Sequence, residues 1–182
     1  LEEGDIVTHL FTANPGGIIN SDGKLVPEAK EAKDRGVWLD TAHGRANCSF
    51  DIGQKVLDQG LTPHCISTDL TLPGRLRTVH SMTEMMTRFL AMGFTLEQVV
   101  EQCTINPAKS IGEEARLGSL SPGKQADVSI LELKEGKWLL YDVIGGTRQT
   151  DLAVIPILSV KKGKVFESGW GPRTWGWEPD QA

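Results

Sequence analysis

Ile66-Ser67-Thr68-Asp69-Leu70 is the stretch that decides the fold. It is a short apolar run that ends in a carboxylate, and a polar loop and a periodic helical segment follow it. Two similar units precede it, because residues 5–9 end in His9 and residues 37–43 end in His43. Strand-like runs that alternate with helical stretches at intervals of about 30 residues are typical of parallel βα units. The sequence therefore predicts an α/β fold.

Each of the three runs has a polar residue at its carboxyl end, namely His9, His43 and Asp69. In a parallel α/β barrel those ends converge on one face, where active sites are built. Imidazole and carboxylate groups are good ligands for Zn and other first-row divalent ions. We therefore predict that these three residues are part of a divalent-metal site. The alternative, that each is an ordinary polar residue of a loop, stays open on the pattern alone.

Helix start and stop signals separate these runs. Pro27 stands at a favoured first helical position, and the helix that it opens is expected to end at Gly36. A second helix is expected from about Phe50 to Asp58, with Gly60 as its stop. Each helix would therefore connect one strand end to the start of the next strand.

Two capping-box patterns predict further helices beyond an irregular loop at 71–79. In each pattern a Ser or Thr is followed three residues later by Glu or Gln, as in Ser81 with Glu84 and Thr95 with Gln98. A last short helix is expected from 106 to 112. Apolar residues recur at helical spacing behind Ser81, and we interpret them as core: Met82, Met85, Met86, Phe89 and Leu90.

Composition and charge argue against several classes of function. A net charge of −5 and a pI near 5.4 do not fit a nucleic-acid-binding surface, which needs a basic face. No apolar run approaches the length that spans a bilayer, and the acidic start at 1–5 lacks the pattern of a signal peptide. Three scattered cysteines, Cys48, Cys65 and Cys103, favour a reducing compartment. We therefore expect a cytoplasmic protein that binds neither nucleic acid nor membrane.

The pattern changes from helical to alternating after Gly118. Short strands are expected at 126–131, 138–143, 155–160 and 164–166, with turns at 122–123, 135–136 and 162–163. We therefore divide the chain into residues 1–114, a small β unit at 115–168, and a tail at 169–182. The tail holds Trp170, Trp175 and Trp177 among Gly and Pro residues.

Three motifs, in this order, resemble those of amidohydrolase-superfamily metallohydrolases, and in particular of the dihydroorotase-like amidohydrolase/deacetylase branch. They are Asp40-Thr41-Ala42-His43-Gly44, the stretch at 66–70, and the segment at 104–127. The resemblance covers most of residues 4–166. It implies the C-terminal half of a metal-dependent-hydrolase (β/α)8 TIM barrel at 1–114, followed by part of a small β-sandwich at 115–168.

The resemblance also implies a cofactor and residue roles. His9 matches the family's metal-binding His of the fifth strand, and His43 matches that of the sixth. Asp69 matches the last-strand Asp, which is both a metal ligand and the proton shuttle. The cofactor would be Zn, binuclear in the full-length protein. The implied reaction is deacetylase-like hydrolysis of an amide or ester bond in a small acylated acid, by attack of a metal-bound hydroxide.

The chain departs from the family pattern in three places. No His-x-His pair occurs in it, so half of the family's metal ligands are missing, and we expect the C-terminal part of a longer protein. The loop at 45–48 differs from the small residues expected there, which leaves the substrate open. Only one helix fits between His43 and Asp69, so Asp69 stands on the seventh or the eighth barrel strand.

Candidates for substrate binding lie in the loops that follow the strand ends. Arg45, Arg75 and Arg77 could hold a substrate carboxylate as bidentate partners, the alternative being solvated surface charge. His80 precedes a helix cap and could face the site. His64 stands at the opposite end of its strand and is interpreted as structural.

Two alternatives to a self-sufficient hydrolase stay open. One is a truncated, catalytically incomplete fragment, or a subunit that needs an N-terminal half. An incomplete parallel sheet exposes an edge and an apolar face, so such a chain is expected to be poorly soluble or to form homo-oligomers. The other alternative is a metal-free binding protein on the same fold.

Overall fold

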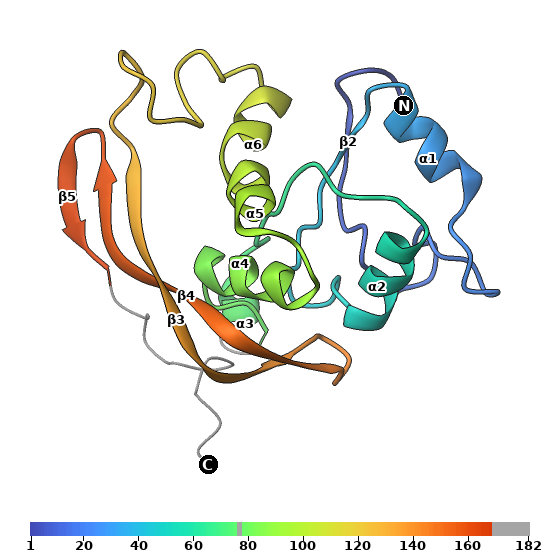
Figure 1. The fold of residues 1–182 in the computed structure, drawn as a ribbon. Helices are drawn as coiled ribbons and strands as arrows, with labels where there is room; N and C mark the ends of the chain where they lie inside the picture. The colour runs from blue at the N-terminus through green and yellow to red at the C-terminus, as the bar shows by residue number, and fades with distance from the viewer. Residues whose placement is uncertain (76–77, 169–182) are drawn as a thin grey trace.

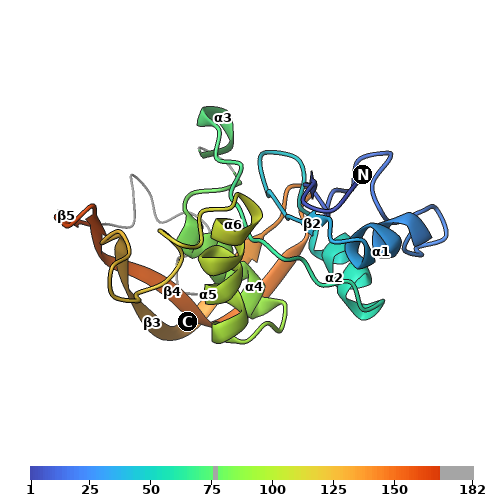
Figure 2. The same cartoon turned by 90° about the horizontal axis from the view of Figure 1, so that it is seen from above.

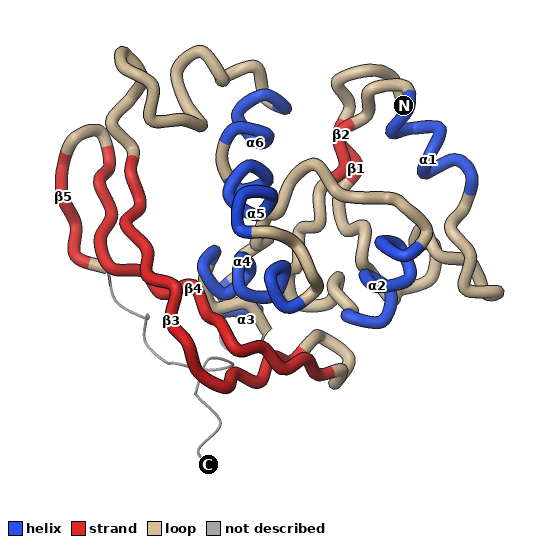
Figure 3. Tube along the Cα trace, in the orientation of Figure 1, coloured by secondary structure: helices blue, strands red, loops and turns tan. Residues whose placement is uncertain are grey.

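Two groups of secondary structure lie side by side in the computed structural model, an α/β part and an antiparallel sheet (Figure 1). The structure describes residues 1–75 and 78–168. Arg77 and the predicted tail at 169–182 lie outside these described residues. Figure 3 shows the short parallel strands on one side, the long antiparallel strands on the other, and helices α3 to α6 between them.

Parallel pairing joins the three runs that the sequence singled out. Strand β1 (Ile6–Val7) pairs with β2 (Trp38–Leu39) in parallel, with Ile6 opposite Trp38. A parallel bridge from Asp40 to Cys65 extends the arrangement to the third run. That run forms no longer strand, but the N–H groups of residues 41, 43 and 44 donate to the carbonyls of residues 65, 67 and 68. The predicted order of parallel units is therefore observed.

The first two helices begin and end close to their predicted residues. Helix α1 spans Pro27–Asp34 and has Pro at its first position. Helix α2 spans Phe50–Asp58, and its N-terminus is capped by Ser49, whose Oγ accepts from the Ile52 N–H at 3.4 Å. Because each helix starts just after a loop that follows a strand, the loops carrying His9 and His43 are anchored at both ends.

Four more helices follow within the described ranges, of which one was not predicted. Helix α3 (Leu72–Arg75) falls in the stretch expected to be irregular, and a hydrogen bond from the Gly74 N–H to Thr71 Oγ1 at 3.2 Å begins it. The others are α4 (Met82–Ala91), α5 (Leu96–Cys103) and α6 (Ile105–Ser110). Among the helices of 1–75 and 78–168, none is long and apolar enough to cross a bilayer.

The two predicted capping boxes have different outcomes. The box of Thr95 and Gln98 at α5 is complete, with both reciprocal hydrogen bonds present. At α4 the Ser81 Oγ accepts from the Glu84 N–H at 3.1 Å, as predicted. The Glu84 carboxylate, however, accepts from the His80 N–H at 2.7 Å and from a buried arginine instead of returning to Ser81. This half of the prediction was wrong because the Glu84 carboxylate forms an ion pair with the buried arginine.

Up to residue 168, the antiparallel sheet contains three described strands in the order β3-β4-β5, where four short strands were expected. They are β3 (Val128–Tyr141), β4 (Thr147–Lys161) and β5 (Lys164–Glu167). The turn predicted at 135–136 is wrong, since β3 continues through it with a register shift between Glu135 and Trp138. The indole of Trp138 lies over Gly136, where a Cβ would be 3.0 Å from its Nε1.

One apolar core joins the α/β part to the sheet. Phe89 of α4 is fully buried, stacks on Phe11 with ring centroids 5.8 Å apart, and shares a cluster with Leu140 of β3 and Val154 of β4. The Thr87 hydroxyl accepts from the Val154 N–H at 2.9 Å across the same contact. Helix α4 lies against β4 in both Figure 1 and Figure 2. The predicted core face of α4 is confirmed for Met85, Met86 and Phe89, whereas Met82 is more exposed.

The three cysteines are free thiols, of which Cys48 and Cys65 are buried and Cys103 is partly buried. Burial raises the pKa of Cys48 to about 12, that of Cys65 to about 11 and that of Cys103 to about 12. Since the thiolate is the reactive form, we expect the native protein near neutral pH to react with a thiol reagent at least ~100-fold more slowly than the urea-unfolded chain. Absorbance of the released chromophore measures both rates. Rapid stoichiometric labelling of the native protein would contradict this burial.

Asp127 ties the start of β3 to the turn between β4 and β5. Its carboxylate accepts from the Lys161 ammonium and from the Lys162 N–H at 2.8 Å, and these hydrogen bonds lower its pKa to about 2. Because the folded pKa lies below the ordinary value, the stabilisation is present above about pH 4 and is lost as the pH falls toward 2.

We therefore expect Asp127→Asn to lower the thermal midpoint slightly at neutral pH, in keeping with an exposed ion pair. The difference from the wild-type protein should shrink as the pH approaches 2, and circular dichroism would follow it. An equal difference at both pH values would show that the carboxylate does not act through its charge.

Candidate functional site

Left-handed backbone conformations mark the strand ends. Among residues 1–75 and 78–168, four non-glycine residues have positive φ, and three of them are His9 (64°), Ala42 (32°) and Asp69 (45°). An L-residue in this region costs about 1–2 kcal/mol, so it persists only where surrounding contacts hold it. Such strain clusters at functional sites, and here it falls on two predicted site residues and on the neighbour of the third.

His43 is fully buried and has one defined tautomer. Its Nδ1 lies 2.8 Å from the Gly44 carbonyl, and because a carbonyl only accepts, Nδ1 carries the proton. Burial, followed by the positive charge of Arg88, lowers the pKa of His43 to about 3, so the ring is neutral at physiological pH. Its Nε2 is buried with no hydrogen-bond partner among the described residues. A neutral ring that donates from one nitrogen and presents the other lone pair is the usual state of a metal-binding histidine.

His9 is connected to the same strand end. Its Nδ1 lies 2.7 Å from the Ala42 carbonyl, and because a carbonyl only accepts, Nδ1 is the donor. The first and second strand ends are therefore joined through the residue that precedes His43. Its Nε2 is the nitrogen left to meet a ligand.

Asp69 lies directly on the glycine that follows His43. A Cβ on Gly44 would be 2.2 Å from Asp69 Oδ2, and Gly44 has a φ of +55°. Only glycine leaves room for a carboxylate at this distance while tolerating the left-handed backbone. The structure thus brings the Asp69 carboxylate onto Gly44, the residue after His43, although Asp69 itself is exposed.

Asp40 holds the three runs together just below these residues. Its Oδ2 accepts from the Thr8 hydroxyl and from the Ser67 hydroxyl, each at 2.8 Å. Thr8 precedes His9, and Ser67 lies two residues before Asp69. The sequence analysis missed this clamp, although Asp40 at the end of an apolar run was a visible signal.

The predicted substrate-binding residues lie in neighbouring loops. Arg45 and Arg75 are exposed, and a Cβ on Gly74 would be 3.8 Å from the Cβ of Arg45, so the loops after His43 and Asp69 touch. The His80 Nδ1 donates to the Arg75 carbonyl at 3.0 Å. His64 accepts from the Leu39 N–H at 3.0 Å, which confirms its structural role.

The described residues do not form a complete metal cluster by themselves. In the ranges 1–75 and 78–168, no three His, Cys, Asp or Glu side chains lie close enough together to hold a metal ion. The residue types nevertheless fit a divalent metal. The Nε2 atom of His43 presents a lone pair that has no hydrogen-bond partner among the described residues. The assignment of His9, His43 and Asp69 as metal ligands stays a prediction.

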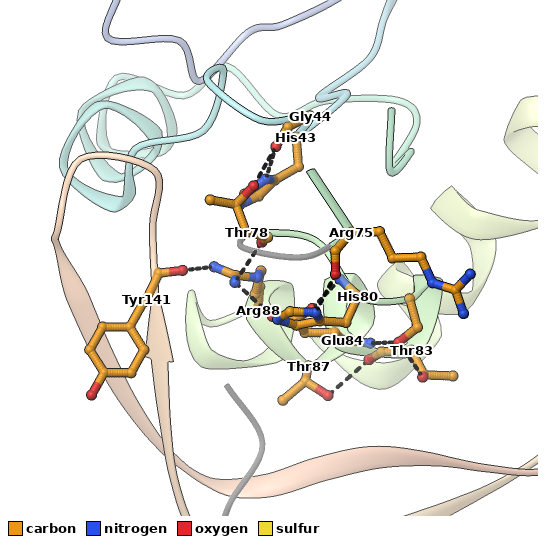
Figure 4. A network of polar contacts seen from close by, with 11 residues as sticks. His43, Gly44, Arg75, Thr78, His80, Thr83, Glu84, Thr87, Arg88 and Tyr141 are labelled. Atoms are coloured by element: carbon orange, nitrogen blue, oxygen red, sulfur yellow. Dashed lines mark hydrogen bonds and ion pairs between the residues drawn. The ribbon is translucent and has the colours of Figure 1, made fainter. Parts of the chain in front are cut away.

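A buried ion pair lies behind this site and was missed by the sequence analysis. Glu84 and Arg88 of α4 are 2.7 Å apart, with 0% and 3% of their side chains exposed. Arg88 also donates to the carbonyls of Tyr141 and of Thr78, the latter at 3.2 Å (Figure 4). The spacing of four residues between Glu84 and Arg88 was a signal for the pair, but not for its burial.

Comparison with known proteins places these observations in a family. The sequence profile of the Amidohydrolase family matches residues 20–165. A deacetylase of Enterococcus faecalis is 27% identical over 170 residues, which are 92% of this chain and 46% of the deacetylase. The resemblance inferred from the three motifs is therefore confirmed.

Two solved structures share the fold. The crystal structure of an adenine deaminase matches with a TM-score of 0.88 and 27% identity over 92% of this chain and 46% of the deaminase. The crystal structure of a dihydroorotase matches with a TM-score of 0.80 and 27% identity over 93% and 45%. The chain spans less than half the length of each of these relatives, and they imply a TIM-barrel-type α/β fold. The chain belongs to the amidohydrolase family, a family of hydrolytic enzymes.

Proposed function

We propose that this chain carries part of the active site of a deacetylase-like hydrolase that cleaves amide or ester bonds in small acylated acids, such as N-acyl amino acids. The observation that carries the proposal is the close approach of the Asp69 carboxylate to Gly44, the residue that follows the neutral, buried His43. Membership of the amidohydrolase family supports hydrolysis as the reaction class.

Asp69 is the proposed proton shuttle. Its carboxylate is exposed at the strand end, where it can take a proton from the attacking water and pass it to the leaving amine. His9, His43 and Asp69 would hold a divalent metal, which we propose to be zinc, binuclear in the full-length protein. When bound, the metal supplies Lewis-acid chemistry at the scissile carbonyl and lowers the pKa of a water molecule. Arg45 and Arg75 would bind the substrate carboxylate.

The same proposal assigns an architecture and a setting. Residues 1–114 would be the C-terminal half of a (β/α)8 barrel, and residues 115–168 part of a small β-sandwich, in line with the share of each relative that the chain matches. Three free thiols support a reducing, cytoplasmic setting. A homo-oligomer is the proposed assembly.

A second candidate is that the chain by itself is a catalytically incomplete piece that needs a complementary N-terminal half. Two observations favour it: the chain spans under half of each relative, and the described residues hold no ready cluster of three ligands. Elemental analysis of the purified chain separates the candidates, because stoichiometric, tightly bound zinc in the isolated chain would count against incompleteness.

The proposed activity is tested on the full-length protein with a panel of N-acetyl amino acids and their ester analogues, scored by release of acetate. We expect turnover that requires the substrate carboxylate and that disappears when a chelator removes the metal. Full metal loading without hydrolysis of any member of the panel would overturn the proposed substrate class.

A further inference from the structure

Packing of helix α4 does not by itself require the buried ion pair of Glu84 and Arg88. Two charges taken out of water are seldom a net gain in stability compared with well-packed apolar side chains. The pair is nevertheless almost fully enclosed, and the Arg88 guanidinium also lies over the Phe50 ring, 5.6 Å from its centroid. The function of the pair is therefore sought in the other hydrogen bonds that the Arg88 guanidinium donates.

A continuous path of hydrogen bonds runs from this pair to His43 (Figure 4). Glu84 Oε1 accepts from Arg88 Nη2 at 2.7 Å, and the same nitrogen donates to the Thr78 carbonyl at 3.2 Å. The Thr78 hydroxyl donates to the Gly44 carbonyl at 3.3 Å. That carbonyl is also the acceptor for His43 Nδ1–H at 2.8 Å.

The path ends on the group that fixes the ring. The Gly44 carbonyl decides which nitrogen of His43 carries the proton, and it thereby decides which nitrogen presents a lone pair. Thr78 supplies the second hydrogen bond to that carbonyl, and Arg88 holds the backbone of Thr78 in reach. The other Arg88 terminal nitrogen donates to the Tyr141 carbonyl at the end of β3, so the antiparallel sheet is tied to the same path.

We infer that Glu84, Arg88 and Thr78 are positioning residues that set the orientation and tautomer of His43, and that they couple the sheet to the candidate site. The value of this device to the enzyme rests on the proposed function, in which His43 is a metal ligand. The positioning itself is a property of the protein before any metal or substrate binds.

The decisive variant is Thr78→Val, which removes the hydroxyl, keeps the shape of the side chain, and leaves the carbonyl that Arg88 contacts. Long-range ¹H–¹⁵N NMR of the metal-free protein reports the tautomer, and His43→Gln identifies the His43 signals. We expect a single Nδ1–H tautomer in the wild-type protein. In Thr78→Val the Gly44 carbonyl is no longer held in place and can turn away from Nδ1, so we expect a mixture or a change to Nε2–H. Affinity for zinc alone, by calorimetry, should fall about 10–100-fold, as is usual when a partner of a metal ligand is lost.

Thr87→Val is the matched control. Thr87 lies on the same helix and accepts from Val154 of the sheet, but it has no place on the path to His43. This variant should loosen the contact between α4 and β4 while leaving both the tautomer and the zinc affinity unchanged. Arg88→Lys serves as the second variant, since lysine keeps the charge opposite Glu84 but cannot reach both carbonyls, and it should resemble Thr78→Val.

An unchanged tautomer and zinc affinity in Thr78→Val would overturn the inference, as would an equal change in Thr87→Val. If Arg88→Lys does not fold, Thr78→Val alone decides. The outcome is separable from that of the proposed function, because the tautomer is measured without metal or substrate. A changed tautomer in a protein that hydrolyses nothing would uphold the positioning and refute only the activity.

Discussion

Asp69→Asn is expected to lower kcat of the full-length protein by about 10²–10⁴-fold, the usual contribution of a positioned general acid–base group. The amide has nearly the shape of the carboxylate but cannot take up a proton at neutral pH. The Asp69 carboxylate lies against Gly44, so the replacement by an amide also removes a negative charge from this position. The kinetics should be measured at equal metal content, confirmed by elemental analysis of both proteins.

Asp58→Asn provides the control for the loss of one carboxylate. Asp58 is exposed at the end of α2, and its Oδ1 accepts from the Gln54 side chain at 2.9 Å. It should leave kcat unchanged. Activity retained in Asp69→Asn with unchanged metal content would rule out the shuttle role, whereas loss of both metal and activity would assign Asp69 to metal binding.

Gly44→Ala is expected to reduce kcat by about 10²-fold with only a moderate loss of stability, because small misplacements of catalytic groups are this costly. The new Cβ would stand 2.2 Å from Asp69 Oδ2, so the carboxylate must move from its present position against Gly44. The left-handed backbone at Gly44 adds about 1–2 kcal/mol of strain, which urea denaturation would measure.

Gly60→Ala separates the strain from the displacement. Gly60 also has a left-handed backbone, with a φ of +83°, but a Cβ there would meet no atom within 4 Å. It should therefore show a similar shift of the urea midpoint and full activity. If the two alanine variants were equally active, the close approach of Asp69 to Gly44 would have no part in turnover.

Features set by local sequence were predictable. Helix α2 has the predicted bounds, and α5 has the predicted capping box, since both depend on residues within one or two turns. The parallel runs before His9 and His43 were also found, as β1 and β2, because an apolar run that stops at a polar residue is a local pattern, whereas the run before Asp69 forms only a bridge at Cys65.

Features set by distant contacts were not predictable. Gly136 looked like a turn residue, but it lies in mid-strand because the indole of Trp138 covers it and β4 pairs alongside. Glu84 looked like a capping residue, but its partner is Arg88, and the burial of the pair depends on β3 and on the segment at Thr78. The sequence supplies His9, His43 and Asp69 as candidates, and their metal-binding role stays a prediction. The carbonyls of Ala42 and Gly44, which accept from the two imidazoles, are visible only in the structure.

The shared core described above bears on how the chain folds and how it can be divided. Phe89 of α4 is buried together with Leu140 and Val154, which come from the long hairpin. A cut at residue 114 would follow the change in sequence pattern but would expose this cluster to water. We therefore expect the two topologies on either side of 114 to unfold as one cooperative unit, so that amide hydrogens of α4 and of central β4 exchange with the same opening free energy.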